Sequence, residues 1–320
     1  MDAATAAAPG APVCGPMRHA PSMRVRPAPT GGPTHPNDRA MTPSTALRLE
    51  GRDALPMLQR ISTQFLSDLV PGGARTTLFC DFRGRLLHRA VVARAADGGI
   101  WLLRDDAPGD ALAAFVDRHV FREEVRIEDR SGALAVWVPA HDVALVAGTM
   151  RERDGAPEAV RVDEAFSLAL GPARPAGAVV ADARARIEAG RTAHGHEIAE
   201  EFTPYEVGLA HEVHLDKGCF TGQEALQRLV TYRSVRRRLA RVEGRGGAPG
   251  TPLDIRSHDD KLGRLTSATS APSPEAADRW IGLAVLRHEA IDEVRPLEVE
   301  GAGPVSQPHA FPITQPLGRP

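Results

Sequence analysis

Short strand-like segments alternate with helical stretches throughout residues 45–138, and the turns between neighbouring strands are only a few residues long. Because such turns join antiparallel rather than parallel strands, the alternation predicts an α+β fold. The predicted strands cover 46–51, 78–82, 86–95, 100–103, 125–129 and 133–138, and the predicted helices cover 54–66 and 110–121. Asp53 is expected to cap the first helix, and Asp182 a short helix ending at Ala189.

The two ends of the chain differ from its middle. Residues 1–43 contain nine prolines and almost no large apolar side chains, so they cannot bury enough surface to offset the entropy of ordering. We interpret them as a disordered extension, or as sequence translated ahead of a start at Met41. After about Val235 short strands and turns predict a small β-rich domain. The expected division is 1–43, a first domain over 44–235, the β-rich domain over 236–303, and an irregular tail over 304–320.

Charge and composition exclude several classes of protein. The 39 basic and 41 acidic residues give a formal net charge of −2, which provides no overall field for holding nucleic acid or an anionic membrane. Three scattered cysteines form neither a disulfide framework nor a CxxC pair, and the twelve histidines lack the spacing of ligands, so no metal site is predicted. We expect a cytoplasmic monomer that neither enters a membrane nor binds nucleic acid directly.

The most informative segment is the loop Lys217-Gly-Cys-Phe-Thr-Gly222, which leads into a predicted helix over 223–229. Its glycines let the backbone approach a ligand closely, and a helix N-terminus favours an anion or a thiolate. Only Lys217 and Lys261 among the 39 basic residues are lysine, so a lysine here is more informative than an arginine. Taken alone, Cys219 is also compatible with a small buried apolar side chain, and Lys217 with a solvated loop lysine.

Residues 217–224, KGCFTGQE, resemble the K-G-C-[FY]-x-G-Q-E signature of the YgfZ-type folate-binding proteins. These are relatives of the glycine-cleavage T-protein and of proteins that mature [4Fe–4S] enzymes. The motif residues are Lys217, Gly218, Cys219, Phe220, Gly222, Gln223 and Glu224, with Arg228 behind them. Residues 51–54 and 263–268 are weaker matches. The resemblance, over about 45–300, implies a T-protein-like folate-binding domain with ferredoxin-like subdomains, followed by a small C-terminal β-barrel.

The resemblance also implies roles for individual residues. Glu188 stands at the position of the glutamate that holds the pterin, and Lys217 at that of a cation that holds the glutamate tail of folate. Arg186 and Glu206 belong to the same set of candidate folate-binding residues, and Cys219 is the candidate functional thiol. T-proteins carry an acidic pair after a Gly-Gly turn, whereas this chain has His88-Arg89 after Arg83-Gly84-Arg85.

These features support three classes of function. The leading one is a tetrahydrofolate-binding accessory protein that assists assembly or repair of Fe–S clusters in client enzymes, including tRNA-modifying ones. The alternative is a folate-dependent aminomethyl- or one-carbon transferase, which the missing acidic pair disfavours. The third and weakest is an RNA-binding protein acting through the arginines at 233, 236, 237, 238 and 241, because a solvated strand or turn face explains these better in a chain of nearly neutral charge. The candidate carboxylates also have purely structural interpretations. Glu188 could simply pair with Arg184 or Arg191, and Glu206 and Glu224 could equally cap a helix or anchor a loop.

Overall fold

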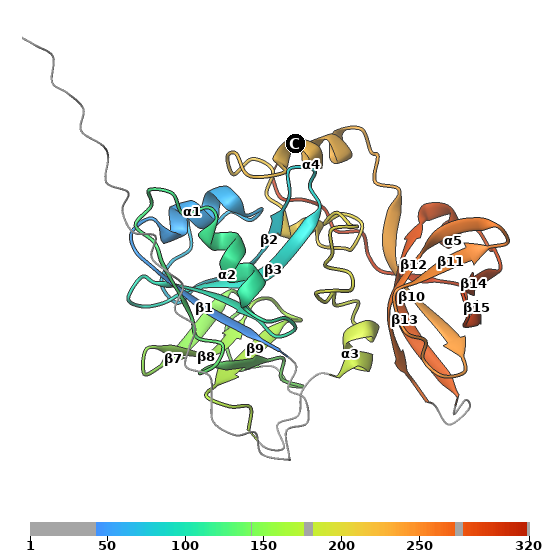
Figure 1. The fold of residues 1–320 in the computed structure, drawn as a ribbon, viewed down its shortest axis with the longest axis horizontal. Helices are drawn as coiled ribbons and strands as arrows, with labels where there is room; N and C mark the ends of the chain where they lie inside the picture. The colour runs from blue at the N-terminus through green and yellow to red at the C-terminus, as the bar shows by residue number, and fades with distance from the viewer. Residues whose placement is uncertain (1–42, 142, 176–181, 273–277, 319–320) are drawn as a thin grey trace, which may run out of the picture.

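The computed structural model describes residues 43–318 except for 142, 176–181 and 273–277. Apart from Pro43, the extension expected over 1–43 lies outside the described residues. Figure 1 shows two sheets and their helices on one side of the molecule and a barrel on the other, joined by a long connecting segment. No helix among the described residues is long and apolar enough to cross a membrane.

The first sheet has five antiparallel strands in the order β2-β3-β4-β1-β5. These are β1 (Thr45–Glu50), β2 (Ala74–Cys80), β3 (Leu86–Arg94), β4 (Ile100–Arg104) and β5 (Arg126–Asp129). Side chains alternate along β1, so Leu47 and Leu49 face a core shared with the helices α1 (Ala54–Ile61) and α2 (Asp110–Asp117). Ala46 faces the opposite side and joins a separate core with the second sheet.

The second sheet has four strands in the order β6-β9-β8-β7. They are β6 (Ala135–Trp137), β7 (Thr149–Arg153), β8 (Ala156–Arg161) and β9 (Ser167–Gly171). Leu168 of β9 and Val160 of β8 are fully buried against Trp101 and Leu103 of the first sheet. The first sheet is therefore covered by helices on one face and by the second sheet on the other.

The C-terminal part of the chain forms a closed barrel of six strands. Pairing of β13 with β10 closes the order β13-β12-β11-β14-β15-β10, and all these pairs are antiparallel. The strands are β10 (Arg237–Arg245), β11 (Leu253–Ser257), β12 (Asp260–Ser270), β13 (Arg279–Arg287), β14 (Leu297–Val299) and β15 (Gly303–Val305). A short helix, α5 (His288–Asp292), follows β13, and Trp280 is fully buried in the barrel core. The α+β class and the C-terminal barrel are both confirmed.

The connecting segment contains α3 (Ala183–Glu188), a 3-10 turn η1 (Ala210–Glu212) and α4 (Gln223–Thr231). Its buried side chains, among them Phe202 and Leu226, share one core with Leu86 of the first sheet and with Leu283 of the barrel. The sheets and the barrel are thus joined by packed apolar side chains rather than by a flexible linker.

After the barrel the chain returns to the connecting segment. We call residues 309–318 the C-terminal strap. Its strand β16 (His309–Ala310) pairs with β10, the Thr314 hydroxyl donates to the Gly208 carbonyl at 3.0 Å, and the backbone N–H of Leu317 donates to the Val213 carbonyl at 2.7 Å. Within the region expected as an irregular tail over 304–320, residues 304–305 complete the barrel strand β15, and the bonds of the strap fix 309–318 across the junction of sheets and barrel.

Helix ends show where local sequence signals compete with tertiary bonds. Asp182 caps α3 as predicted, because its carboxylate accepts the Ala185 N–H at 2.7 Å. Asp53 does not cap α1, since its carboxylate accepts the Glu124 N–H at 2.8 Å. The helix predicted over 54–66 ends at Ile61. Beyond it, the backbone N–H of Thr63 donates to the Leu78 carbonyl of β2 and so does not continue the helix. The helix predicted over 110–121 ends at Asp117.

Candidate functional site

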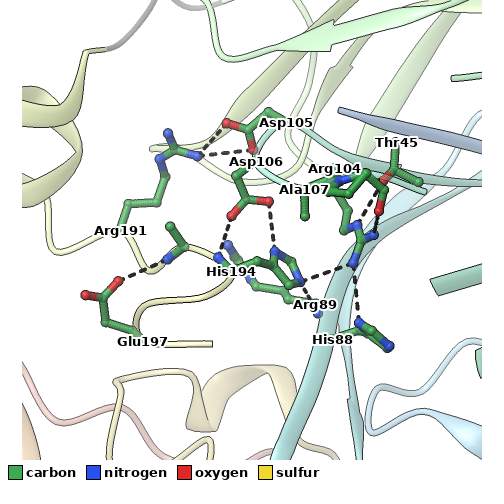
Figure 2. Close-up of polar contacts among 12 residues, drawn as sticks. Thr45, His88, Arg89, Arg104, Asp105, Asp106, Ala107, Arg191, His194 and Glu197 are labelled. Atoms are coloured by element: carbon green, nitrogen blue, oxygen red, sulfur yellow. Dashed lines mark hydrogen bonds and ion pairs between the residues drawn. The ribbon is translucent and has the colours of Figure 1, made fainter. Parts of the chain in front are cut away.

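Charged side chains gather at the centre of the molecule, between the first sheet and the connecting segment (Figure 2). We call them the central charge cluster. It consists of His88, Arg89, Arg104, Asp105, Asp106, Arg191, His194, Glu197 and Glu212. Burying this many charges is costly unless each has a partner, so the pairing pattern decides which groups stay available to a ligand.

Arg89 on β3 and Glu212 on η1 form one of the two most buried ion pairs around the cluster, beside that of Arg186 and Glu197. The Arg89 Nη2 lies 2.6 Å from Glu212 Oε1, and its Nε donates to both carboxylate oxygens at 3.0 and 3.1 Å. The Glu212 side chain is 1% exposed and that of Arg89 13%. This bidentate geometry commits the Arg89 guanidinium to a structural partner.

His194 is held in one orientation by bonds at both ring nitrogens. Its Nδ1 lies 2.8 Å from Asp106 Oδ1, and its Nε2 accepts the backbone N–H of Arg89 at 3.0 Å. A ring that accepts at Nε2 and donates from Nδ1 is the neutral tautomer. Burial raises the pKa of the Asp106 carboxyl, but the side-chain and backbone hydrogen bonds from His194 outweigh it and bring that pKa to about 2.

Arg104 lies between the two histidines of the cluster. Its Nη1 is 3.4 Å from His88 Nδ1 and 3.4 Å from His194 Nε2, while its Nε donates to Thr45 Oγ1 at 3.0 Å. Burial, together with Arg104 and His194, lowers the pKa of His88 to about 4, so this imidazole is neutral at pH 7. Burial also lowers the pKa of Arg104, to about 10, and it stays charged.

A second chain of bonds connects the cluster to the barrel. Arg191 pairs with Asp105 at 3.0 Å, and burial raises the pKa of that carboxyl. The fully buried Glu197 accepts from Arg186 at 3.1 Å and from the hydroxyls of Thr266 and Ser267 on β12.

The cluster borders a cleft of about 340 Å³ between β4, the second sheet, α3 and β12. We call it the central cleft. Its lining combines carboxylates, cations, imidazoles and an indole, with Asp105, Asp106, Trp137, Asp182, Arg186, Arg191, His194, His196 and Ser267 among them. A neighbouring hollow is lined by Thr192, whose hydroxyl is buried and has no partner among the described residues. Ligand sites in proteins have this size and this mixture of fixed polar groups.

The predicted site residues fall at four separate places, the last of which is the motif loop. Arg186 lines the central cleft, while Glu188 at the end of α3 does not and pairs with Arg184 at 2.8 Å on the exposed side of the helix. Glu206 is 8% exposed and is held by Thr203 and by Arg237 at 2.7 Å, in another cleft at the junction with the barrel.

The motif loop packs on α1 and on the β2–β3 turn. The Lys217 ammonium donates to the Gln59 carbonyl and lies 5.1 Å from the centre of the Phe220 ring, and burial lowers its pKa to about 8. Cys219 is a free, exposed thiol. Gly218 (φ +100°) and Gly222 (φ +85°) are both in the left-handed region, and a Cβ at Gly222 would lie 2.5 Å from the Asp81 carbonyl oxygen.

The helix after the loop carries the remaining motif residues. Gln223 donates to the Leu215 carbonyl at 2.7 Å and so ties α4 to the strand-like segment before the motif. Glu224 and Arg228 pair with each other at 2.5 Å on the exposed face of α4. They therefore stabilise the helix without reaching the central cleft.

The sequence analysis did not single out most of the central charge cluster. Arg104, Asp105 and Asp106 end a buried strand, and Glu212 and Glu197 stand in otherwise apolar surroundings. The one signal that could have indicated these residues is a charged side chain within an otherwise apolar stretch of sequence. Their partners lie up to 123 positions away, so the pairing itself was not visible.

Comparison with known proteins places the chain in a family. No family model matches it. The aminomethyltransferase of Rubrobacter xylanophilus is 32% identical over 277 residues, covering 75% of this chain and 73% of that protein. The aminomethyltransferase of Thermoanaerobacter sp. is 24% identical over 286 residues, covering 75% of each chain. The crystal structure of the glycine cleavage system aminomethyltransferase T from Bartonella henselae matches with a TM-score of 0.65 at 16% identity, over 88% of this chain and 86% of that one, and so shares its fold. The chain belongs to the aminomethyltransferase family, with the T-protein type of fold.

Proposed function

We propose that the chain binds tetrahydrofolate or a derivative of it in the central cleft. The observation that carries the proposal is the fixed set of donors and acceptors around this cleft, in a chain with the T-protein type of fold. The Asp105 and Asp106 carboxylates can accept N–H groups of the pterin, and Arg186 and Arg191 can donate to its carbonyl. The unpartnered hydroxyl of Thr192 beside the cleft is a further group that a polar ligand would satisfy.

Glu188 enters this proposal through a change of partner. Its side chain is 45% exposed, and its partner Arg184 is 46% exposed, so the ion pair costs little to break. A released Glu188 carboxylate can accept two pterin N–H groups at once. We propose Lys217 as the cation for the glutamate tail. Its ammonium contacts the Gln59 carbonyl and the Phe220 ring and pairs with no carboxylate of the described residues, so its charge is available to a ligand.

Tetrahydrofolate binding by calorimetry tests the assignment of Glu188. Glu188→Ala is expected to weaken binding about ten- to a hundredfold, which corresponds to roughly 1.5–3 kcal/mol for a charge-assisted pair. Arg184→Ala is the matched control, since it removes the same ion pair but keeps the carboxylate, and it should leave the affinity equal or tighter. Unchanged affinity in Glu188→Ala would remove Glu188 from the site.

We further propose that the folate-bound protein assists assembly or repair of Fe–S clusters in client enzymes, including tRNA-modifying ones. At the position where T-proteins carry an acidic pair, this chain has a neutral His88 and an Arg89 committed to Glu212. Bound tetrahydrofolate would supply nitrogen atoms that carry a one-carbon unit. Positions 88 and 89, however, offer no carboxylate that could take part in the transfer of that unit. The exposed Cys219 thiol supports a role at the surface, because a thiolate is a soft ligand and a nucleophile.

Complementation of a bacterial strain that lacks its own YgfZ-type protein, scored on an Fe–S-dependent tRNA modification, tests this role. The wild-type chain should restore the modification. Cys219→Ser should fail, although its tetrahydrofolate affinity stays within about threefold, because serine offers no thiolate near neutral pH. Full complementation by the serine variant would make Cys219 a residue without a chemical role.

Aminomethyl transfer is the second candidate, because the similar proteins of Rubrobacter xylanophilus and Thermoanaerobacter sp. are aminomethyltransferases. An assay with an aminomethyl-loaded lipoyl protein separates the two functions. Tetrahydrofolate-dependent release of ammonia with formation of methylene-folate would establish transfer. Folate binding without that release, in a chain that complements, supports the accessory role.

A further inference from the structure

A second cleft, of about 380 Å³, lies where the connecting segment enters the barrel. We call it the arginine cleft. Its charged lining residues are Arg85, Glu201, Glu206, Arg236, Arg237, Lys261, Arg264 and Arg287. Figure 1 shows the chain running from α4 into β10 at this junction, with α3 lower in the view.

The lining of the arginine cleft carries an excess of positive charge. Its two carboxylates are already in use, because Glu206 pairs with Arg237 at 2.7 Å and Glu201 with Arg264 at 2.6 Å. Two of the remaining cations have partners just outside the lining, Arg287 with Glu289 at 3.4 Å and Lys261 with Asp254 at 2.8 Å. Six positive groups against these four carboxylates leave two positive charges without compensation.

Arg236 is the cation most available to a ligand. Its side chain is exposed, and among the described residues its guanidinium has no hydrogen-bond or ion-pair partner. Arg287 is 58% exposed and held only by the 3.4 Å contact to Glu289, so it too can turn toward a bound anion. Both side chains can present a planar fork of N–H donors, the geometry that matches a phosphate.

The next arginines of β10 beyond the cleft have carboxylates close by. Arg238 lies 3.0 Å from Asp292, and Arg241 lies 3.6 Å from Glu243, a carboxylate that Arg279 also contacts. A nucleic-acid surface needs a stripe of cations that follows several phosphates, whereas the six cations of the arginine cleft line one hollow. The cleft also has apolar lining in Leu229 and Leu262, which suits the uncharged part of a small ligand.

We propose that the arginine cleft binds a phosphorylated small molecule, whose phosphate contacts Arg236 and Arg287. A doubly negative phosphate matches the two uncompensated charges. The site is separate from the central cleft, so it adds a second ligand to the proposed folate protein and does not depend on folate binding.

Calorimetric titration of the full chain with inorganic pyrophosphate and with ADP tests the proposal. We expect one site per chain, and about tenfold weaker binding in each of Arg236→Gln and Arg287→Gln, as the loss of one charge-assisted contact predicts. Arg245→Gln is the matched control, because Arg245 is an exposed arginine at the far end of the same strand, outside the cleft, and its affinity should be unchanged. All three positions are exposed, so these variants should fold normally.

Each other outcome overturns the proposal. Failure of the wild-type chain to bind either probe at millimolar concentration removes the site. Equal affinity of wild type and Arg236→Gln places the bound phosphate elsewhere. Binding of single-stranded RNA with affinity that rises with its length, without binding of pyrophosphate, assigns the surface to nucleic acid. Equal affinity for a γ-linked glutamate oligomer assigns the cleft to carboxylate anions.

Discussion

Removal of the Glu212 carboxylate is expected to destabilise the whole chain, because it leaves the charge of Arg89 without its bidentate partner. The pair is almost completely buried, with 1% of the Glu212 side chain and 13% of the Arg89 side chain exposed. Breaking a buried pair by removing one partner typically costs about 3–5 kcal/mol. We expect Glu212→Gln to fall near 3 kcal/mol, at the lower end of this range, since an amide oxygen in the position of Oε1 still accepts two of the three hydrogen bonds from Arg89.

Thermal unfolding followed by circular dichroism provides the measurement. A loss of about 3 kcal/mol corresponds to a Tm lowered by roughly 4–6 °C, because the unfolding entropy is about 2.1 cal/mol/K per residue. Glu224→Gln is the control, because it breaks an ion pair of similar length whose side chains are 79% and 69% exposed, and its effect should be below about 0.5 kcal/mol.

A double variant distinguishes charge from shape. Arg89→Met combined with Glu212→Leu removes both charges and keeps apolar volume, so it should recover most of the stability lost in Glu212→Gln. If Glu212→Gln unfolds within about 1 °C of wild type, the pair contributes no more than a surface ion pair, and the electrostatic account of the central charge cluster is wrong.

Three further outcomes are expected. In urea unfolding, Gly222→Ala should cost more than about 1 kcal/mol more stability than Gly218→Ala. Both glycines have a positive φ, but only at Gly222 would the added Cβ lie 2.5 Å from a carbonyl oxygen. Equal effects of the two variants would contradict this. In a Lys261→Arg background, amine acetylation read by mass spectrometry should show Lys217 titrating near pH 8. Because burial puts the pKa of Lys217 in the folded chain below the usual lysine value, the free energy of unfolding should rise with pH above about 8. Lys217→Met should abolish this rise. An acetylation midpoint of Lys217 above pH 10 would refute the burial of its ammonium. Deletion of 311–320 should lower Tm by several degrees, because it removes the bonds of the strap, and an unchanged Tm would show that those bonds are not needed.

Local signals in the sequence predicted much of the fold. The hairpin of β2 and β3 around Gly84 follows from strand alternation and a short turn, and the cap at Asp182 follows from its place before a helical stretch. Asp53 carries the same local signal and still does not cap, because a backbone N–H that lies 71 positions away competes for its carboxylate. Local patterns therefore predict elements well where no distant group offers a better bond.

The candidate site was predicted less completely, for a related reason. Loop geometry around Gly218 and Gly222 is encoded locally, and both glycines have the positive φ that their loop role requires. The pairing of His194 with Asp106 joins positions 88 apart, so no window of sequence contains it. For Glu188 the local interpretation was the correct one, because the structure contains the ion pair with Arg184 that the sequence offered as the alternative. Its role in binding the pterin stays a prediction.

The C-terminal strap gives the order of biosynthesis a structural meaning. Its Leu317 bonds to Val213 and Leu215, and the Phe311 ring packs beneath Gly190, so the strap fastens elements that are synthesised more than a hundred residues before it. Until the strap emerges from the ribosome, the connecting segment keeps open backbone groups and uncovered apolar side chains. A chain that lacks the strap would therefore present those surfaces to chaperones and degradation enzymes.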